Sequence, residues 1–218
     1  MEWQEPRDYF INDIALFQGK LYILTMELEH NQQELYVLDD GQEQMAIRTI
    51  LGVDREWMDN YTQRNYLVIS GERLLMVERG INLPPLYHRD SGIVKRTRHF
   101  KIFEAADLSS GHGRWIEVTT LMGQALFLSE GCSESLPTMG QCGDVGARED
   151  CIYFISENDI PILDSGVYNL RDKRVMPLML ETMATPAASH GPWYPTWLFP
   201  ETFQLVNGTI SCYEFIRC

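Results

Sequence analysis

Paired carboxylates can act as general acid and general base, and this sequence has two pairs of adjacent acidic residues. Asp39-Asp40 ends one apolar run, and Glu149-Asp150 precedes another. Acid–base catalysis needs carboxyl groups that converge on one point. Neighbouring residues of a strand point to opposite faces, so both pairs suit turns at strand ends better than an acid–base dyad.

Metal-binding residues are scattered. No two of the five histidines have the spacing that places both imidazoles on one face of a strand or helix. The five cysteines are odd in number and contain no C-x-x-C, which favours reduced thiols over a zinc site or a disulfide framework. The sequence therefore predicts no metal and no cofactor. These residues are His30, His88, His99, His112 and His190, and Cys132, Cys142, Cys151, Cys212 and Cys218.

Phosphate-binding and nucleophile motifs are also missing. Gly111-His112-Gly113 lacks the glycine spacing of a dinucleotide or phosphate loop and is interpreted as a hairpin turn. No serine, including Ser135, Ser165 and Ser189, lies in a G-x-S-x-G frame. The sequence assigns no catalytic, cofactor-binding or metal-ligating residue, and residues that bind a partner stay unknown.

Two local clusters have the composition of a binding surface. The basic one would contact an acidic partner or act as a weak nuclear signal, although a solvated loop that protects the next strand is favoured. The aromatic one would be an exposed patch, although packing against the last sheet is favoured. The clusters are Arg89, Lys95, Arg96, Arg98 and His99, and Trp193, Tyr194, Trp197 and Phe199.

The composition indicates a folded, acidic protein. Of 218 residues, 44% are hydrophobic and 22% charged, and the net charge is −13. An acidic chain disfavours nucleic acid as a partner, because phosphate contacts need a basic footprint. The N-terminus resembles no signal peptide and no apolar run would cross a membrane, so we expect no membrane association and a location in the cytoplasm or nucleus.

The elements that must position these residues are short strands, which occur in a repeated sequence pattern. Residues 13–24 and 65–77 each read as two runs of β-branched and aromatic residues that meet at a glycine, Gly19 or Gly71. Glycine tolerates the positive φ of a tight hairpin turn. Recurrence at about 50 residues is typical of a β-propeller. The predicted fold is all-β, a partial propeller of about four blades built from four-stranded antiparallel sheets.

The predicted organisation is a lead-in over residues 1–12, the propeller over 13–200 and a strand-like tail over 201–218. Residues 129–150 are expected to form a loop rich in Gly, Ser and Cys. Trp115 lies on an alternating strand and is expected to be largely buried between blades. A propeller that starts within its ring leaves one sheet without its neighbour, so we expect self-association unless residues 193–218 supply the missing strand or blade.

Together these sequence segments resemble the KIB-type β-propeller domain, a plant domain of unknown function commonly found C-terminal to an F-box. The resemblance covers roughly residues 9–200 and rests on the order and spacing of several segments. They include Asp13–Tyr22, Tyr66–Val77, Phe100–Phe103, Arg114–Val118, Gln124–Leu128, Cys151–Phe154, Gly166–Leu170 and Pro195–Pro200.

The resemblance implies a non-enzymatic protein-interaction module, similar to the substrate-binding propeller of plant F-box proteins in ubiquitin ligases. A protein partner is expected, but not a Skp1-type adaptor, because that contact belongs to an F-box and residues 1–12 are too short for one. The alternative is a propeller-fold enzyme, such as a glycosidase with an active site in its channel. Such an enzyme needs carboxylates that converge from different blades.

Overall fold

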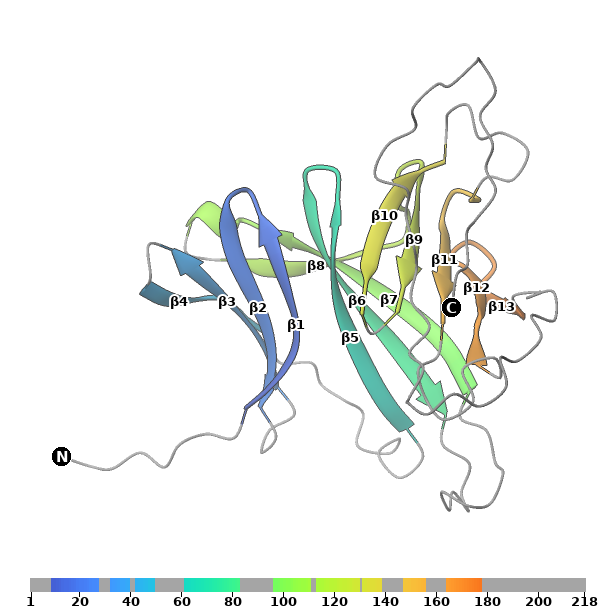
Figure 1. The fold of residues 1–218 in the computed structure, drawn as a ribbon, viewed down its shortest axis with the longest axis horizontal. Helices are drawn as coiled ribbons and strands as arrows, with labels where there is room; N and C mark the ends of the chain where they lie inside the picture. The colour runs from blue at the N-terminus through green and yellow to red at the C-terminus, as the bar shows by residue number, and fades with distance from the viewer. Residues whose placement is uncertain are drawn as a thin grey trace, which may run out of the picture. The chain divides into compact units, whose positions relative to one another are not determined.

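A computed structural model of the chain shows an all-β protein, as predicted (Figure 1). Thirteen strands and a 3₁₀ turn, η2 (Leu108–Ser110), are described. The structure describes residues 9–27, 32–39, 42–49, 61–82, 96–110, 113–129, 131–138, 147–155 and 164–177. The chain divides into two compact units, residues 1–87 with 100–118 and residues 88–99 with 119–218.

The first sheet of unit 1, sheet A, is a four-stranded antiparallel meander. It consists of β1 (Tyr9–Phe17), β2 (Lys20–Glu27), β3 (Gln32–Asp39) and β4 (Gln42–Thr49). The turn between β1 and β2 has positive φ at both central residues, 49° at Gln18 and 78° at Gly19. This geometry matches the right-handed twist of the flanking strands and confirms the first predicted hairpin.

The second sheet of unit 1, sheet B, repeats the same antiparallel order. It consists of β5 (Tyr61–Ser70), β6 (Arg73–Asn82), β7 (Arg96–Ala106) and β8 (Arg114–Val118). The first four residues of β7, up to His99, are assigned to unit 2. Gly71 has φ 62° at the first central position of the β5–β6 turn, and this confirms the second predicted hairpin.

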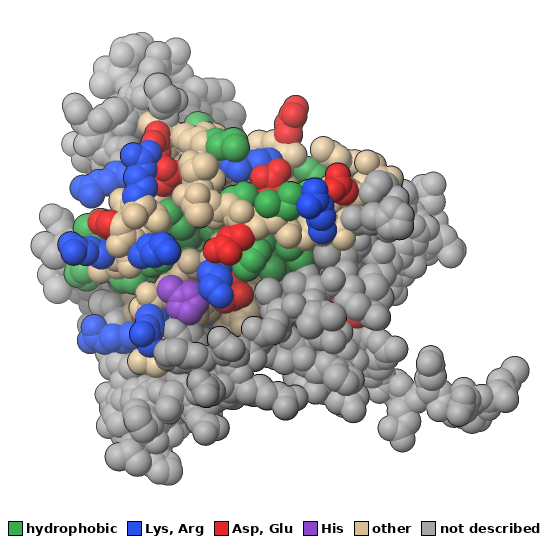
Figure 2. Space-filling model, turned by 180° about the vertical axis from the view of Figure 1, so that it is seen from behind, with side chains coloured by type: hydrophobic (Ala, Val, Ile, Leu, Met, Phe, Trp, Pro, Cys, Tyr) green, Lys and Arg blue, Asp and Glu red, His purple; other side chains and the backbone are tan. Residues whose placement is uncertain are grey.

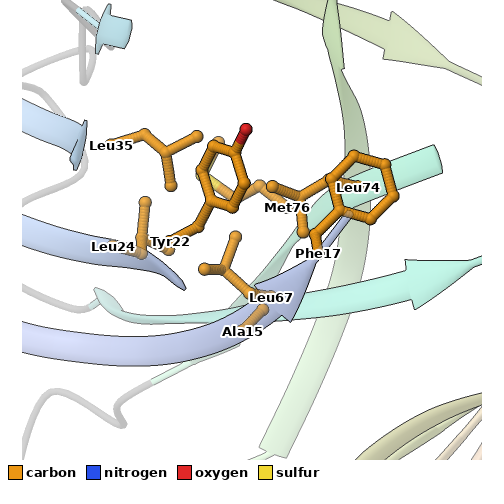
Figure 3. Close-up of a cluster of buried hydrophobic side chains, with 8 residues drawn as sticks. All are labelled: Ala15, Phe17, Tyr22, Leu24, Leu35, Leu67, Leu74 and Met76. Carbon is orange, nitrogen blue, oxygen red and sulfur yellow. The ribbon is translucent and has the colours of Figure 1, made fainter. Parts of the chain in front are cut away.

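The core of unit 1 forms where sheets A and B pack together. Alternate residues of β1 and β2, together with Leu35 of β3, form one cluster with side chains of β5 and β6 (Figure 3). Leu24 and Leu35 are fully buried there. Burial of such side chains stabilises the folded state by about 1.5–3 kcal/mol each. The cluster consists of Ala15, Phe17, Tyr22, Leu24, Leu35, Leu67, Leu74 and Met76.

Trp115 on β8 packs against this cluster. Its side chain is half-buried, so the prediction that it is largely buried overstated its burial. The reason is its position on β8, the outer strand of sheet B, which among the described strands is hydrogen-bonded to β7 alone. The indole nevertheless packs against the cluster that sheets A and B share.

The third sheet, sheet C in unit 2, is five-stranded. Its spatial order is β10 (Ser133–Pro137), β9 (Gln124–Leu128), β11 (Cys151–Phe154), β12 (Gly166–Asn169) and β13 (Arg174–Pro177). The pairing of β9 with β11 is parallel, whereas the other pairings are antiparallel. Sheet C therefore departs from the predicted four-stranded antiparallel pattern.

The extra strand of sheet C is β10, which lies within the segment predicted as a loop. Its residues Ser133-Glu134-Ser135 are polar and give no apolar run to recognise. They form a strand because β9 offers an open edge, and the register joins Ser133 to Leu128 and Pro137 to Gln124. Pro137 is compatible with an edge strand, which needs no donor on its outer side.

Strand ends also differ from the predicted ones. Strand β1 starts at Tyr9, inside the segment 1–12 that was predicted as a lead-in. Strand β7 starts at Arg96, so three residues of the basic cluster belong to a strand rather than a loop. The strand-like tail over 201–218 and the aromatic cluster from Trp193 to Phe199 lie outside the described residues.

Candidate functional site

Two buried aspartates and one half-buried aspartate are distinctive polar groups in the described parts of the chain, and each of them accepts a hydrogen bond from a distant backbone N–H. The first is Asp13, at a bulge of β1 where the register shifts between Ile11 and Asp13. Its Oδ2 accepts a hydrogen bond from the backbone N–H of Leu67 at 2.8 Å, and Oδ1 accepts one from Ile14 at 2.8 Å. Asp13 thus links β1 of sheet A to the edge strand β5 of sheet B.

Burial raises the pKa of Asp13 above its ordinary value, although the hydrogen bonds from Leu67 and Ile14 act in the opposite direction. A carboxyl with a raised pKa inside a fold is a possible general acid. Here, however, both oxygens already accept backbone N–H groups of the same chain. The geometry fits a fixed inter-sheet link better than a group that exchanges protons with a substrate.

The second aspartate, Asp150, lies in the turn before β11 with φ 56°. Its Oδ1 accepts hydrogen bonds from Leu121 N at 2.7 Å and Thr120 Oγ1 at 3.0 Å. Its Oδ2 accepts one from Arg171 Nε at 3.0 Å. Arg171 also pairs with Glu149. The prediction that Glu149-Asp150 serves turn structure is therefore confirmed.

The pKa of Asp150 is held below its ordinary value. Burial raises the pKa. The hydrogen bonds from Leu121, Arg171 and Thr120 and the charge of Arg171 lower it by more than burial raises it. The side chain is only 3% exposed and remains ionised because its charge is compensated. A carboxylate so stabilised is a poor proton donor or acceptor near neutral pH.

The third aspartate is Asp164, two residues before β12. Its Oδ1 accepts a hydrogen bond from Thr97 N at 2.6 Å, and its Oδ2 accepts one from Thr97 Oγ1 at 3.0 Å. Both residues belong to unit 2, although they are 67 positions apart in the sequence. The contact ties Thr97, at the start of β7, to the segment that precedes β12. Asp39 ends β3, whereas Asp40 lies outside the described residues.

Sequence reasoning missed Asp13 and Asp164, because single acids beside apolar runs are common at strand ends. The signal that could have identified Asp13 is its position inside β1, where the bulge turns a polar residue toward the next sheet. The amide nitrogen of the neighbouring Asn12 is buried and has no hydrogen-bond partner among the described residues. The bulge therefore places two polar side chains, Asn12 and Asp13, within an otherwise apolar strand.

The remaining chemical groups of the sequence do not converge in the described ranges. His99 is half-buried on β7, and the other histidines lie outside those ranges. Within them, no cluster of three or more His, Cys, Asp or Glu side chains could hold a metal ion. Ser165 is buried, Ser135 donates a hydrogen bond to Gln124 Oε1 at 3.4 Å, and Ser189 is not described.

Cys132 and Cys151 are free thiols, as predicted; the other three cysteines are outside the described residues. Burial raises the pKa of both thiols, and the carboxylate of Glu134 adds to this at Cys132. The thiol rather than the thiolate then prevails at neutral pH, which makes both side chains weak nucleophiles. Gly113 lies in the connection between the antiparallel strands β7 and β8, in agreement with the predicted hairpin turn.

The charged side chains of the described surface are mixed in sign. On the face in Figure 2, basic and acidic groups lie beside one another, and hydrophobic side chains appear between them. Ion pairs join Arg73 to Glu104 at 3.6 Å and Arg114 to Asp107 at 3.0 Å. Of the basic cluster, Arg96 and Arg98 are exposed, while Arg89 and Lys95 are not described.

No helix among the described residues is long and apolar enough to cross a membrane. Consecutive antiparallel meanders that pack face to face, as sheets A and B do, define the chain as a β-propeller protein with part of a ring. The KIB1-4 beta-propeller family matches residues 1–169, and the chain belongs to that family. No curated protein and no solved structure matches the chain.

Proposed function

We propose that this propeller is a non-enzymatic module that binds another protein, in the manner of the substrate-binding propeller of plant F-box proteins in ubiquitin ligases. The observation that carries the proposal is that the buried carboxylates of the described ranges have partners within the chain. Asp150 and Asp164, like the half-buried Asp13, accept hydrogen bonds from backbone N–H groups. Glu34 accepts one from the Tyr36 hydroxyl, and Glu78 Oε1 lies 3.9 Å from Lys101 Nζ. A propeller glycosidase needs two carboxyl groups that face the scissile bond from opposite sides.

Membership of the KIB1-4 beta-propeller family supports the same proposal, since propellers offer loops and strand edges from several blades to a partner. The proposal includes a location in the cytoplasm or nucleus. The free thiols of Cys132 and Cys151 agree with a reducing compartment. Nucleic acid and membranes are not among the proposed partners.

Affinity purification with the whole chain as bait, followed by mass spectrometry, tests the proposal in an extract of the source tissue. We expect one protein in near-stoichiometric amount, which re-forms the complex when both proteins are purified. A bait with Leu75→Asp is the control for chaperones that bind unfolded protein, because Leu75 is 0% exposed. A partner recovered equally by both baits would count against the proposal.

The enzyme alternative is tested with a panel of chromogenic glycosides. We expect no turnover above buffer. Turnover that Asp13→Asn abolishes while the chain stays folded would overturn the proposal in favour of a hydrolase. A separate pull-down with purified Skp1-type adaptor should show no binding, since the proposal assigns that contact to an F-box and not to the propeller. Clear binding would refute this part.

A further inference from the structure

Three short connections meet at one end of sheet C in unit 2. Strand β11 begins at Cys151, which pairs with Asn169 at the end of β12, and Asn169 pairs with Arg174 at the start of β13. Asp150 N donates a hydrogen bond to the carbonyl oxygen of Gln124, the first residue of β9, at 3.1 Å. The connections that lie side by side there are residues 119–123, 147–150 and 170–173, and we call them the loop end of sheet C.

Asp150 holds the three connections of the loop end together. Its carboxylate accepts hydrogen bonds from Thr120 and Leu121 of the first connection and from Arg171 of the third. Its carbonyl oxygen accepts a further one from Leu170 N at 2.9 Å. Loops that are fixed in this way lose little conformational entropy when they bind a partner. The loop end is therefore a preorganised surface.

Met122 in the loop end has a conformation and an exposure that do not stabilise the fold. Met122 and Gly123 have consecutive positive φ values, 55° and 78°, which favour the pair Asn-Gly. A bulky side chain is strained in this left-handed region. Burial could offset the strain, but the Met122 side chain is 69% exposed. Backbone strain is typical of functional positions, and the flexible thioether of methionine adapts to varied apolar partners.

Exposed cations gather at or directly beside the loop end, although the chain has 31 acidic and 18 basic residues. Three of them form no ion pair with any described residue, whereas Arg171 is paired with Glu149 and Asp150. The one other carboxylate of the loop end, Asp172, accepts a hydrogen bond from the backbone N–H of Arg174. The local charge is thus opposite in sign to that of the chain. The three cations are Arg148, Lys173 and Arg174.

We propose that the loop end of sheet C is the surface that binds the protein partner, and that the partner presents an acidic segment with an apolar side chain. The proposal rests on the proposed function and adds its site and the chemistry of its partner. The apolar side chain covers Met122, and the acidic side chains pair with Arg148, Lys173 and Arg174. The net charge of −13 repels an acidic segment from the rest of the chain, which directs the segment to this end.

Selection of random peptides displayed on phage against the whole chain is the first test. We expect enriched peptides that combine Asp or Glu with an apolar residue and that bind Met122→Asn about tenfold or more weakly than wild type. Asn tolerates the left-handed φ, so Met122→Asn should unfold at the same temperature as wild type or at a higher one. The matched control is Leu16→Asn, which should bind as wild type, because Leu16 is 66% exposed and belongs to unit 1.

Charge reversal tests the cations of the loop end with the same peptides. Arg148→Glu should weaken binding, whereas Arg96→Glu should not, because Arg96 is an exposed residue of β7 outside the loop end. Both variants change the net charge equally. Binding to wild type should weaken as salt is added, since the salt screens the ion pairs. Full binding to Arg148→Glu, loss of binding in Arg96→Glu, or binding that strengthens with salt would overturn the proposal, and so would a selection without enriched peptides.

The protein recovered by affinity purification, once purified, is the second probe. Its binding to wild type, Leu16→Asn and Arg96→Glu, together with weaker binding to Met122→Asn and Arg148→Glu, supports the proposal. Equal binding to all variants would leave the proposed function standing and show that the loop end is not its site. A wild-type chain that associates with itself through Met122 would identify a second copy as the occupant and overturn the proposal. The peptide selection thus decides the loop end, and the affinity purification decides the proposed function.

Discussion

At the scale of single residues, the half-buried Asp13 and the buried Asp150 are carboxylates with opposite pKa shifts. Burial dominates at Asp13 and raises its pKa. At Asp150 burial is outweighed by three hydrogen bonds and by the charge of Arg171, and the pKa falls. The two groups therefore contribute to stability in different pH ranges, and the same amide substitution separates them.

Asp13→Asn keeps an amide oxygen that can accept the Leu67 N–H but removes the ionisation. Because the folded-state pKa is raised, the contribution of Asp13 to stability is full below about pH 3.8 and is lost as the pH rises through the raised pKa. The free energy of unfolding of Asp13→Asn, relative to wild type, should thus increase from about pH 3 to about pH 7. Urea titrations at several pH values measure this, and a flat difference would contradict it.

Asp150→Asn should give the opposite trend. Asn tolerates the positive φ of this position, so the change reports on the carboxylate rather than on the backbone. The contribution of Asp150 is present above about pH 3.8 and is lost as the pH falls through the lowered pKa. We expect a loss of about 1–3 kcal/mol near neutral pH, which shrinks in acid. The same titrations check this, and an equal loss at all pH values would argue against ionic hydrogen bonds.

At the scale of elements, glycines shape the sheets in two different ways. Gly71 has φ 62° in the β5–β6 turn, and a Cβ there would meet nothing within 4 Å. Gly166 starts β12 inside sheet C, where a Cβ would lie 2.6 Å from Met176 O and 3.1 Å from Phe154 Cζ. The first glycine permits a backbone conformation, and the second permits close approach of two chain segments.

The substitution of each glycine by alanine separates these roles. Gly71→Ala should destabilise the chain by about 1 kcal/mol, from backbone strain alone. Gly166→Ala should cost more than about 2 kcal/mol, because the backbone oxygen of Met176 and the ring of Phe154 must shift. Denaturant midpoints compare the two variants under the same conditions. A larger loss for Gly71→Ala would show that the contacts of Gly166 relax easily.

At the scale of the molecule, each of the two compact units has its own core. In unit 1 the cluster between sheets A and B is completed by Trp115 of β8. In unit 2 a smaller cluster of Ala125, Phe127 and Ile155 lies on one face of sheet C. The Phe127 ring stacks on Tyr153 with centroids 4.8 Å apart. Sheet-on-sheet burial is therefore the main stabilising contact of unit 1.

Trp115 tests how much that contact depends on one aromatic side chain. Trp115→Ala should cost about 2–4 kcal/mol, somewhat less than for a fully buried aromatic, because part of the indole is exposed. Its Nε1 is buried and has no hydrogen-bond partner within the described ranges. Trp115→Phe removes this unsatisfied donor and should cost less than about 1 kcal/mol. Calorimetry of both variants measures the difference, and equal losses would mean that the indole N–H is satisfied.

Much of sheets A and B could be predicted from the sequence because their signals are local. Alternation in 13–24 and 65–77, with a glycine at each turn, specifies hairpins whose strands are adjacent in the chain. Strand β8, on which Trp115 was expected to lie, has the bounds Arg114–Val118 of one of the segments that carry the family resemblance. The absence of a recognisable catalytic motif is likewise a property of the residue order alone.

The tertiary structure decided what local signals do not contain. The polar strand β10 exists because β9 has an open edge, and the parallel pairing of β9 with β11 joins strands separated by a long connection. Asp13 and Asp164 acquire their roles only when folding brings their hydrogen-bond donors close. Leu67 is 54 positions from Asp13 in the sequence, and Thr97 is 67 positions from Asp164. Which face of sheet A is covered also depends on sheet B. Strand propensity acts between sequence neighbours, whereas burial and hydrogen-bond partners are set by residues that only folding brings together.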